Sequence, residues 1–180
     1  MKKTKNVIIA VTGSISAYKA CELVRLLCKR GNKVNVLMSK AATHFVTPLT
    51  FQTLSKNPVV IDMFEDPLAW DPQHVALAQG AHVVAVVPAT ANVIAKLAQG
   101  ICDDIITCVI AATRAKVVVC PAMNENMYTH PATQDNIARL KRFGYRIIEP
   151  VKGELACGKV GIGRLADLDK IISEIEKALK

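Results

Sequence analysis

The chain has 180 residues, of which 51% are hydrophobic and 21% charged. It is therefore long enough to bury a sizeable core and too apolar for a disordered chain. No apolar run approaches the ~18 residues of a membrane span. The basic start "MKKTKN" precedes an apolar run that is broken too soon for a signal peptide. We expect a cytoplasmic protein with no membrane-embedded part.

The formal net charge is +8, and five of the lysines lie at the two ends of the chain, where charge is mostly solvated: Lys2, Lys3, Lys5, Lys177 and Lys180. No arginine-rich stretch with interleaved aromatic residues is present, so nucleic acid is not an expected partner. A modestly basic surface suits small anionic ligands. No pair among the six cysteines has the CxxC spacing of a zinc site, and we expect no metal.

Strand-like and helix-like patterns alternate along the whole chain. Apolar runs predict strands at 6–11, 33–38, 57–62, 82–87, 115–120 and 145–150. Helical spacing predicts helices at 18–30, from about 41, and at 72–79, 91–99, 103–113, 131–144 and 165–180. Strands that are apolar on both faces and separated by helices indicate an α/β fold with an open doubly wound parallel sheet, Rossmann-like (flavodoxin-like). Ligands of such folds bind at the carboxyl ends of the strands.

Residues 151–166 break this rhythm with the sequence "VKGELACGKVGIGRLA", which holds four of the nine glycines. The stretch has neither helical nor alternating spacing. A long segment without regular structure is often a functional loop. We therefore expect an irregular, glycine-rich lid here.

Small polar residues follow three of the predicted strands. Gly13 and Ser14 follow the first, Ser39 the second, and Thr90 lies in "PATAN" after the central strand. A single glycine is not the GxGxxG of a dinucleotide site, which disfavours NAD. A Gly-Ser turn at a helix start can still hold one phosphate, although Ser14 or Ser16 could simply cap the helix. Three such tips together favour a phosphate-bearing ligand.

Asn124 lies in "PAMNENMY", directly after a buried strand. An amide at such a position costs free energy unless it is hydrogen-bonded. It could bind a ligand, or it could cap or turn the chain toward the helix that begins at Pro131. His74 has a side chain suited to acid–base chemistry near neutral pH, and its alternative is a structural or solvated histidine.

Four stretches, "GSISAYK", "PATAN", "PAMNENMY" and "GELACGKVGIGR", resemble those of the homo-oligomeric flavin-containing cysteine decarboxylases, in the same order and spacing. The resemblance covers almost the whole chain. It implies one FMN-binding decarboxylase domain over 1–180, with a substrate clamp at about 151–166. It also implies a homotrimer, or a dodecamer built of trimers, with the site between subunits. The implied small-molecule substrate is 4′-phospho-N-pantothenoylcysteine, made by a synthetase that is a partner or a fused domain.

The resemblance also assigns roles to individual residues. His74 would act as a base or position the substrate, Asn124 would bind the substrate carboxylate, and Cys157 would donate a proton from the clamp. Met127 and Ala156 would also contact the substrate. The implied FMN-binding residues are Gly13, Ser14, Ile15, Ser39, Ala89, Thr90, Ala91, Asn92 and Ala122. Thr90 replaces a more common serine, and Tyr128 a frequent tryptophan.

The chemistry explains why a flavin is needed. A cysteine amide does not lose CO₂ readily, because the carbanion left at Cα has no electron sink. Oxidation of the CH₂–SH group to a thioaldehyde provides one, and loss of CO₂ then gives an ene-thiolate. Return of a hydride from the flavin, with a proton from an acid, completes a net non-redox reaction. Two alternatives remain: a peptidyl-cysteine decarboxylase acting on a precursor peptide, and a non-catalytic flavin-binding regulatory subunit.

Overall fold

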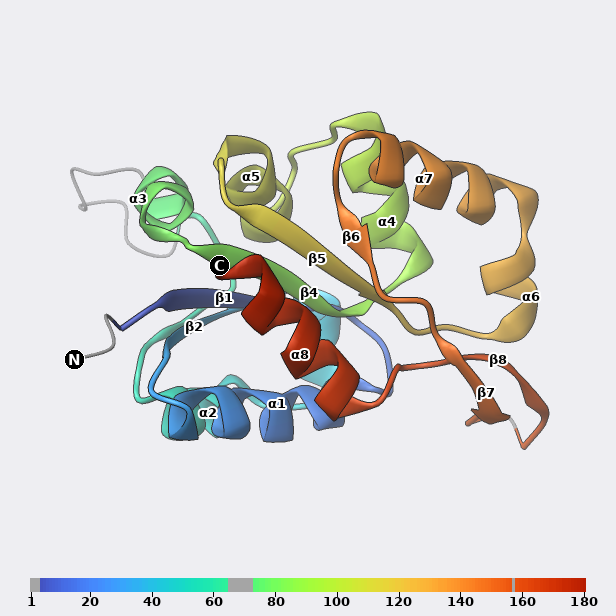
Figure 1. The fold of residues 1–180 in the computed structure, drawn as a ribbon, viewed down its shortest axis with the longest axis horizontal. Coiled ribbons are helices and arrows are strands. Elements are labelled where there is room, and N and C mark those ends of the chain that lie inside the picture. Colours follow the sequence, from blue (N-terminus) through green and yellow to red (C-terminus); the bar gives the residue numbers. More distant parts are fainter. Residues whose placement is uncertain (1–3, 65–72, 157) are drawn as a thin grey trace.

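The structure is a computed structural model that describes residues 4–64, 73–156 and 158–180. Its main feature is a six-stranded sheet of order β3-β2-β1-β4-β5-β6, in which every pair of neighbours is parallel (Figure 1). The strands are β1 (Asn6–Val11), β2 (Lys33–Met38), β3 (Val59–Val60), β4 (Val83–Ala89), β5 (Lys116–Pro121) and β6 (Arg146–Ile147). The predicted doubly wound α/β fold is confirmed, and the strand order is that of the Rossmann sheet.

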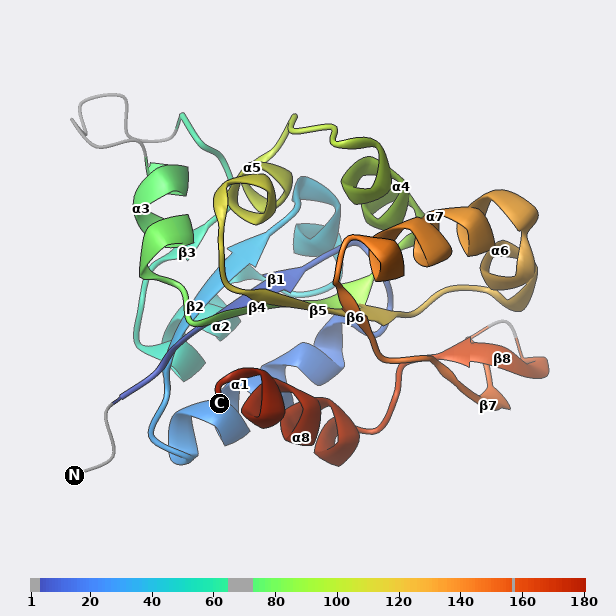
Figure 2. The same cartoon turned by 45° about the horizontal axis from the view of Figure 1, so that its top comes forward.

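Helices cover both faces of this sheet (Figures 1 and 2). One face carries α1 (Ala17–Lys29), α2 (Pro48–Ser55) and α8 (Leu168–Ala178). The other carries α3 (Gln73–Gly80), α4 (Ala91–Gln99), α5 (Ile105–Ala112) and α7 (Pro131–Arg142). A 3₁₀ helix, η1 (Lys40–His44), follows β2, and the short α6 (Glu125–Thr129) follows β5.

The central strand β1 shows how the sequence divides the core. Val7 and Ile9 pack into the layer under α1 and α8, while Ile8 and Ala10 pack into the opposite layer. All four side chains are fully buried. Successive side chains of a strand point to opposite faces, so a continuous apolar run is what a sheet covered on both sides requires.

The remaining two strands form a separate antiparallel hairpin from β7 (Val151–Glu154) and β8 (Val160–Arg164). The prediction that residues 151–166 lack regular structure was therefore wrong, while their role as a lid stays a prediction. Gly153, Gly161 and Gly163 have no side chains and so hide the alternating pattern that marks a strand. In the figures the hairpin extends from the end of the sheet where α6 lies (Figures 1 and 2).

The smaller differences between the predicted elements and the structure have local causes. The helix α6 was not predicted, because five residues are too few to show a helical period. Strand β4 continues through Pro88 to Ala89 instead of ending before the proline. Among the residues that the structure describes, no helix combines the length and apolarity needed to cross a membrane.

Candidate active site

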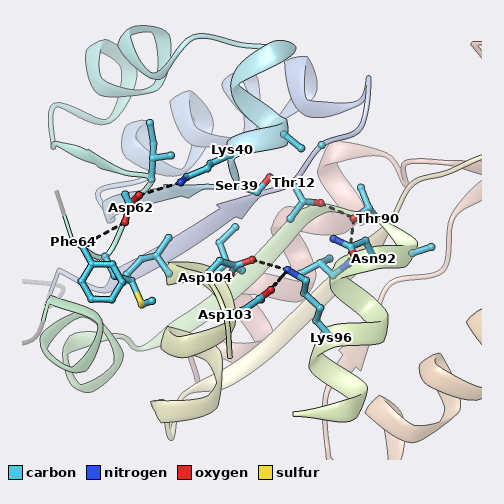
Figure 3. A pocket seen from close by; sticks show the side chains of 18 of the residues that line it. Thr12, Ser39, Lys40, Asp62, Phe64, Thr90, Asn92, Lys96, Asp103 and Asp104 are labelled. Atoms are coloured by element: carbon cyan, nitrogen blue, oxygen red, sulfur yellow. Dashed lines mark hydrogen bonds and ion pairs between the residues drawn. The ribbon is translucent and has the colours of Figure 1, made fainter. Parts of the chain in front are cut away.

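Two cavities open beside the carboxyl ends of the strands. The first has a volume of about 610 Å³ and is lined from the ends of β1, β2 and β4, with α4 and α5 on one side (Figure 3). It lies where β1 has β2 on one side and β4 on the other. That reversal of strand order is where doubly wound sheets bind ligands. Gly13, Ser39 and Thr90, the three polar tips predicted from sequence, all line this cavity.

Thr12 joins two of these strand ends. Its buried hydroxyl, 3% exposed as a residue, donates to the carbonyl of Pro88 at 2.7 Å and accepts the backbone N–H of Thr90 at 3.1 Å (Figure 3). The tip of β1 and the start of α4 are therefore held in a fixed relation. Thr12 was not singled out from the sequence, although a polar residue at the end of an apolar strand was the available signal.

The hydroxyls of the other two tips are oriented by helix caps. Ser39 Oγ accepts the N–H of Ala42 at 3.2 Å, and Thr90 Oγ1 accepts the N–H of Val93 at 3.3 Å. Both caps use the hydroxyl as an acceptor, so its O–H hydrogen can still be donated to an anion. A Cβ on Gly13 would stand 2.6 Å from Ala41 Cβ, so glycine is needed for the close approach of the first turn to η1.

The charged side chains of the first cavity largely neutralise one another. Lys40 pairs with Asp62 at 3.2 Å, and Lys96 pairs with Asp103 at 2.8 Å and Asp104 at 3.4 Å (Figure 3). The hydrogen bond with Asp103 raises the pKa of Lys96 and, reciprocally, lowers the pKa of Asp103. Because both lysines have carboxylate partners, a phosphate in this cavity would be bound mainly by backbone N–H groups and hydroxyls.

The second cavity has a volume of about 680 Å³ and lies between the start of α1, the end of β5 and the β7–β8 hairpin. Five predicted site residues line it: Ser14, Ile15, Ala122, Asn124 and Ala156. It also contains Lys19, Arg164 and Glu154, which the sequence did not single out. Lys19 makes no ion pair within the described ranges, and Arg164 approaches Asp167 at 3.6 Å. The cavity thus contains Asn124, which is predicted to bind the substrate carboxylate, together with the cationic side chains of Lys19 and Arg164.

Asn124 is the N-cap of α6, and its Oδ1 accepts the backbone N–H of Asn126 at 2.9 Å. Asn124 therefore has a capping role, but the helix that it caps is α6, because the N-cap of the helix that begins at Pro131 is His130. A role for Asn124 toward a substrate stays a prediction. The helix α1, in contrast, has Ser16 at its N-cap with no side-chain capping bond, and Ser14 Oγ only weakly accepts the Ser16 N–H at 3.4 Å.

Three further predicted residues, His74, Met127 and Ala89, differ in their surroundings. His74, in α3, lines neither cavity, and α3 and the β7–β8 hairpin lie at opposite ends of the molecule (Figures 1 and 2). Met127 lines the first cavity, away from Ala156. Ala89 is fully buried at the end of β4. Cys157 lies outside the described residues.

A family model described as "Flavoprotein" matches residues 1–180 of the chain. The chain belongs to the Flavoprotein family. This match, together with the relatives below, confirms the resemblance to flavin-containing cysteine decarboxylases that the four sequence stretches indicate.

Two curated relatives of this flavoprotein differ in length. A protein of Streptococcus mutans, described as a probable phosphopantothenoylcysteine decarboxylase, is 50% identical over 181 residues, covering 98% of this chain and 99% of the relative. The coenzyme A biosynthesis bifunctional protein CoaBC of Bacillus subtilis is 46% identical over 177 residues, covering 98% of this chain but 44% of the relative. This flavoprotein therefore spans nearly all of the first relative and less than half of the second.

The solved structures similar to this chain also include decarboxylases. A mutant PPC decarboxylase in complex with pantothenoylaminoethenethiol matches with a TM-score of 0.88 at 28% identity, covering 97% of this chain and 98% of that one. The FMN-dependent cysteine decarboxylase SpaF matches with a TM-score of 0.85 at 31% identity, covering 98% of each chain. The structural neighbours of this flavoprotein thus include FMN-dependent decarboxylases.

Proposed function

We propose that this flavoprotein decarboxylates 4′-phospho-N-pantothenoylcysteine to 4′-phosphopantetheine and CO₂, a step of coenzyme A biosynthesis. The observation that carries the proposal is the 50% identity, over nearly the full length of both chains, with a probable phosphopantothenoylcysteine decarboxylase. Fold alone would not support a function, but this likeness extends through the strand tips and the clamp. The cytoplasm is the proposed location.

The first cavity fits FMN. Its volume of about 610 Å³ lies in the range of cofactor sites. The hydroxyls of Ser39 and Thr90 and the turn at Gly13 supply neutral donors for a phosphate, and the small residue Ala91 lets a flat ring approach. We assign FMN binding to five residues of this cavity, Gly13, Ser39, Thr90, Ala91 and Asn92. We assign it also to Ser14, Ile15 and Ala122, which line the second cavity, and to Ala89 at the end of β4.

The second cavity supports a phosphorylated, acidic substrate. Asn124 would hydrogen-bond the cysteine carboxylate, with Ala156 as a contact of the clamp and Met127 contacting the substrate from the neighbouring cavity. Lys19 and Arg164, which line the same cavity, would pair with the substrate phosphate. A peptide substrate has no need of such a pair, so the phosphorylated substrate is preferred to the peptidyl-cysteine alternative.

The reaction replaces a carboxylate by a proton, so the protein must hold the first and deliver the second. Bound FMN supplies the two-electron chemistry that gives the substrate its electron sink. Asn124 would fix the carboxylate so that its bond to Cα can break toward that sink. Cys157, in the clamp, would deliver the proton that the product needs. His74 would act as a base or position the substrate.

We further propose that the active form is a homotrimer, or a dodecamer built of trimers, in which His74 comes from a neighbouring copy. The position of α3, at the end of the molecule opposite the hairpin, supports this arrangement (Figures 1 and 2). Residues 1–180 would form one decarboxylase domain that works with, or is fused to, phosphopantothenoylcysteine synthetase.

One preparation tests the function directly. We expect the purified protein to be yellow with non-covalent FMN and to release CO₂ from 4′-phospho-N-pantothenoylcysteine, with 4′-phosphopantetheine as the product by mass spectrometry. A protein that binds FMN but releases no CO₂ would favour the regulatory subunit. A protein that cannot be reconstituted with FMN would refute the proposal.

A further inference from the structure

The β7–β8 hairpin is attached to the segment that joins β5 to α6. The backbone N–H of Met123 donates to the carbonyl of Gly163 at 3.0 Å. Two residues further along, Glu125 Oε1 accepts the backbone N–H of Ile162 at 3.1 Å. Asn124 lies between these two contacts. The segment that carries Asn124 is therefore hydrogen-bonded to strand β8 through the residue before Asn124 and the residue after it.

Two glycines of β8 make this close approach possible. Gly163 has φ of +139°, a conformation that favours glycine, and a Cβ there would overlap the carbonyl oxygen of Met123. A Cβ on Gly161 would stand 2.5 Å from Glu125 Oε2. Any side chain at Gly161 would thus occupy the space that the Glu125 carboxylate uses to reach Ile162.

The other strand of the hairpin is anchored at its base. Glu149, just before β7, accepts hydrogen bonds from the hydroxyl of Tyr128 and, at 2.6 Å, from Lys141 Nζ. The tip of the hairpin is closed by a bond of 2.8 Å from the Leu155 N–H to the Lys159 carbonyl. The hairpin is thus held at both strands, but only the Glu125 contact is made by a side chain next to Asn124.

We infer that Glu125 is a positioning residue: its carboxylate holds β8 against the β5–α6 segment and so fixes the hairpin that carries the clamp relative to Asn124. This inference rests on the proposed function for its effect on turnover, but the contact itself does not. A carboxylate is expected here because it accepts a backbone N–H more strongly than a neutral group does. Glu125 is the first residue of the five-residue helix α6, and its position in that helix does not require a hydrogen bond to another element.

Hydrogen exchange tests the contact without any assay of activity. In Glu125→Ala the amide of Ile162 should exchange about tenfold faster than in the wild type, because it loses a charge-assisted hydrogen bond. Glu125→Gln keeps a carbonyl acceptor and should restore most of the protection. Asp135→Asn, which removes an exposed carboxylate from α7, is the matched control and should change nothing at Ile162.

Product analysis tests the positioning role. If the clamp delivers the final proton, Glu125→Ala should release CO₂ with kcat within about twofold of the wild type. A several-fold larger share of its product should leave as the ene-thiol, which lacks two hydrogens of 4′-phosphopantetheine. Each such release leaves the flavin reduced, so the assay is run in air, where dissolved O₂ reoxidises the flavin for the next turnover. Glu125→Gln should return the product ratio toward the wild-type value. A merely structural role would lower the stability and the total rate without moving this ratio.

Gly161 provides an independent route to the same defect. Gly161→Ala should displace the Glu125 carboxylate and so reproduce both the faster exchange at Ile162 and the altered product ratio. Added to Glu125→Ala, the same methyl group should cause little further change, since the carboxylate it displaces is gone. Such a double-mutant cycle gives a coupling term only if the two residues act through one contact.

The outcomes separate this inference from the proposed function. A wild-type protein that releases no CO₂ contradicts the function, while the exchange experiment still decides whether Glu125 holds β8. If the wild type turns over normally and Glu125→Ala changes neither the Ile162 exchange rate nor the product ratio, the inference fails alone. Additive effects of Gly161→Ala and Glu125→Ala would also overturn it.

Discussion

Thr12 and Thr90 lie at the ends of neighbouring elements and are joined by a hydrogen bond of 3.1 Å from the Thr90 backbone N–H to the Thr12 hydroxyl. The same hydroxyl donates to the Pro88 carbonyl at 2.7 Å. The wall of the first cavity therefore depends on one buried hydroxyl that is both donor and acceptor. Neither strand tip alone determines the shape of the cavity.

Thr12→Val should damage this wall while preserving side-chain shape. It leaves the Thr90 N–H and the Pro88 carbonyl without their partner, at a cost of roughly 1–3 kcal/mol. We expect a lower Tm and FMN affinity weaker by about tenfold, measured by flavin fluorescence. Thr12→Ser keeps the hydroxyl and should stay close to wild type. Equal losses in both variants would show that the hydroxyl is not what matters.

Asn124→Asp separates the cap from the predicted ligand role. Aspartate caps helices as well as asparagine does, so α6 should remain intact. A carboxylate would, however, repel the substrate carboxylate by several kcal/mol. We expect kcat/KM to fall by at least about 100-fold with FMN still bound. The exposed neighbour offers a control, Asn126→Asp, that should leave kcat/KM nearly unchanged.

Cys157→Ser tests the final protonation. A serine hydroxyl is far less acidic than a thiol of pKa ~8.5 and should protonate the ene-thiolate poorly. The variant should still release some CO₂, leave its flavin reduced and accumulate the ene-thiol, which mass spectrometry distinguishes from 4′-phosphopantetheine by two hydrogens. Saturated product at the wild-type rate would remove Cys157 from the mechanism. Complete loss of CO₂ release would place its role earlier.

Lys19→Met tests recognition of the substrate phosphate. Loss of one charged partner should raise KM for the phosphorylated substrate by about tenfold. The unphosphorylated analogue, N-pantothenoylcysteine, should react equally well with the variant and the wild type. Lys29→Met, near the far end of α1, serves as the control. If both substrates lose activity equally in Lys19→Met, the lysine does not recognise the phosphate.

Glu149→Gln should destabilise the protein in a pH-dependent way. Burial acts to raise the pKa of Glu149, but hydrogen bonds from Lys141 and Tyr128 outweigh it and lower that pKa. A lowered folded-state pKa gives stability that is present above the unfolded value of ~4.3 and is lost as pH falls through the folded value. Since the carboxylate is 44% exposed, screening limits the loss to about 1 kcal/mol at pH 7. Chemical denaturation should show this difference at pH 7, and the difference should shrink below the unfolded value of ~4.3 and vanish once pH is under the folded pKa.

The sequence predicted the structure best where the local pattern of a segment agrees with the place of that segment in the fold. The bounds predicted for β1, β2 and α4 match the structure, because Thr12, Ser39 and Gly100 mark where these segments end. The tips Gly13, Ser39 and Thr90 were also found, since the fold class alone brings strand ends together. Glu125 and the Lys96–Asp103 pair were missed because their partners are set by tertiary packing.

The strand order also has a consequence for synthesis of the chain. Strand β1 lies in the middle of the sheet, yet Val7 pairs with Val34 on one side and with Val83 on the other. A nascent chain that has completed only β1, β2 and β3 therefore exposes one edge of the apolar strand β1 until β4 emerges. Unpaired apolar edges favour aggregation, and distant pairings form slowly. The reversal of strand order that creates the ligand crevice thus also leaves an apolar edge at the centre of the sheet unpaired until β4 has been synthesised.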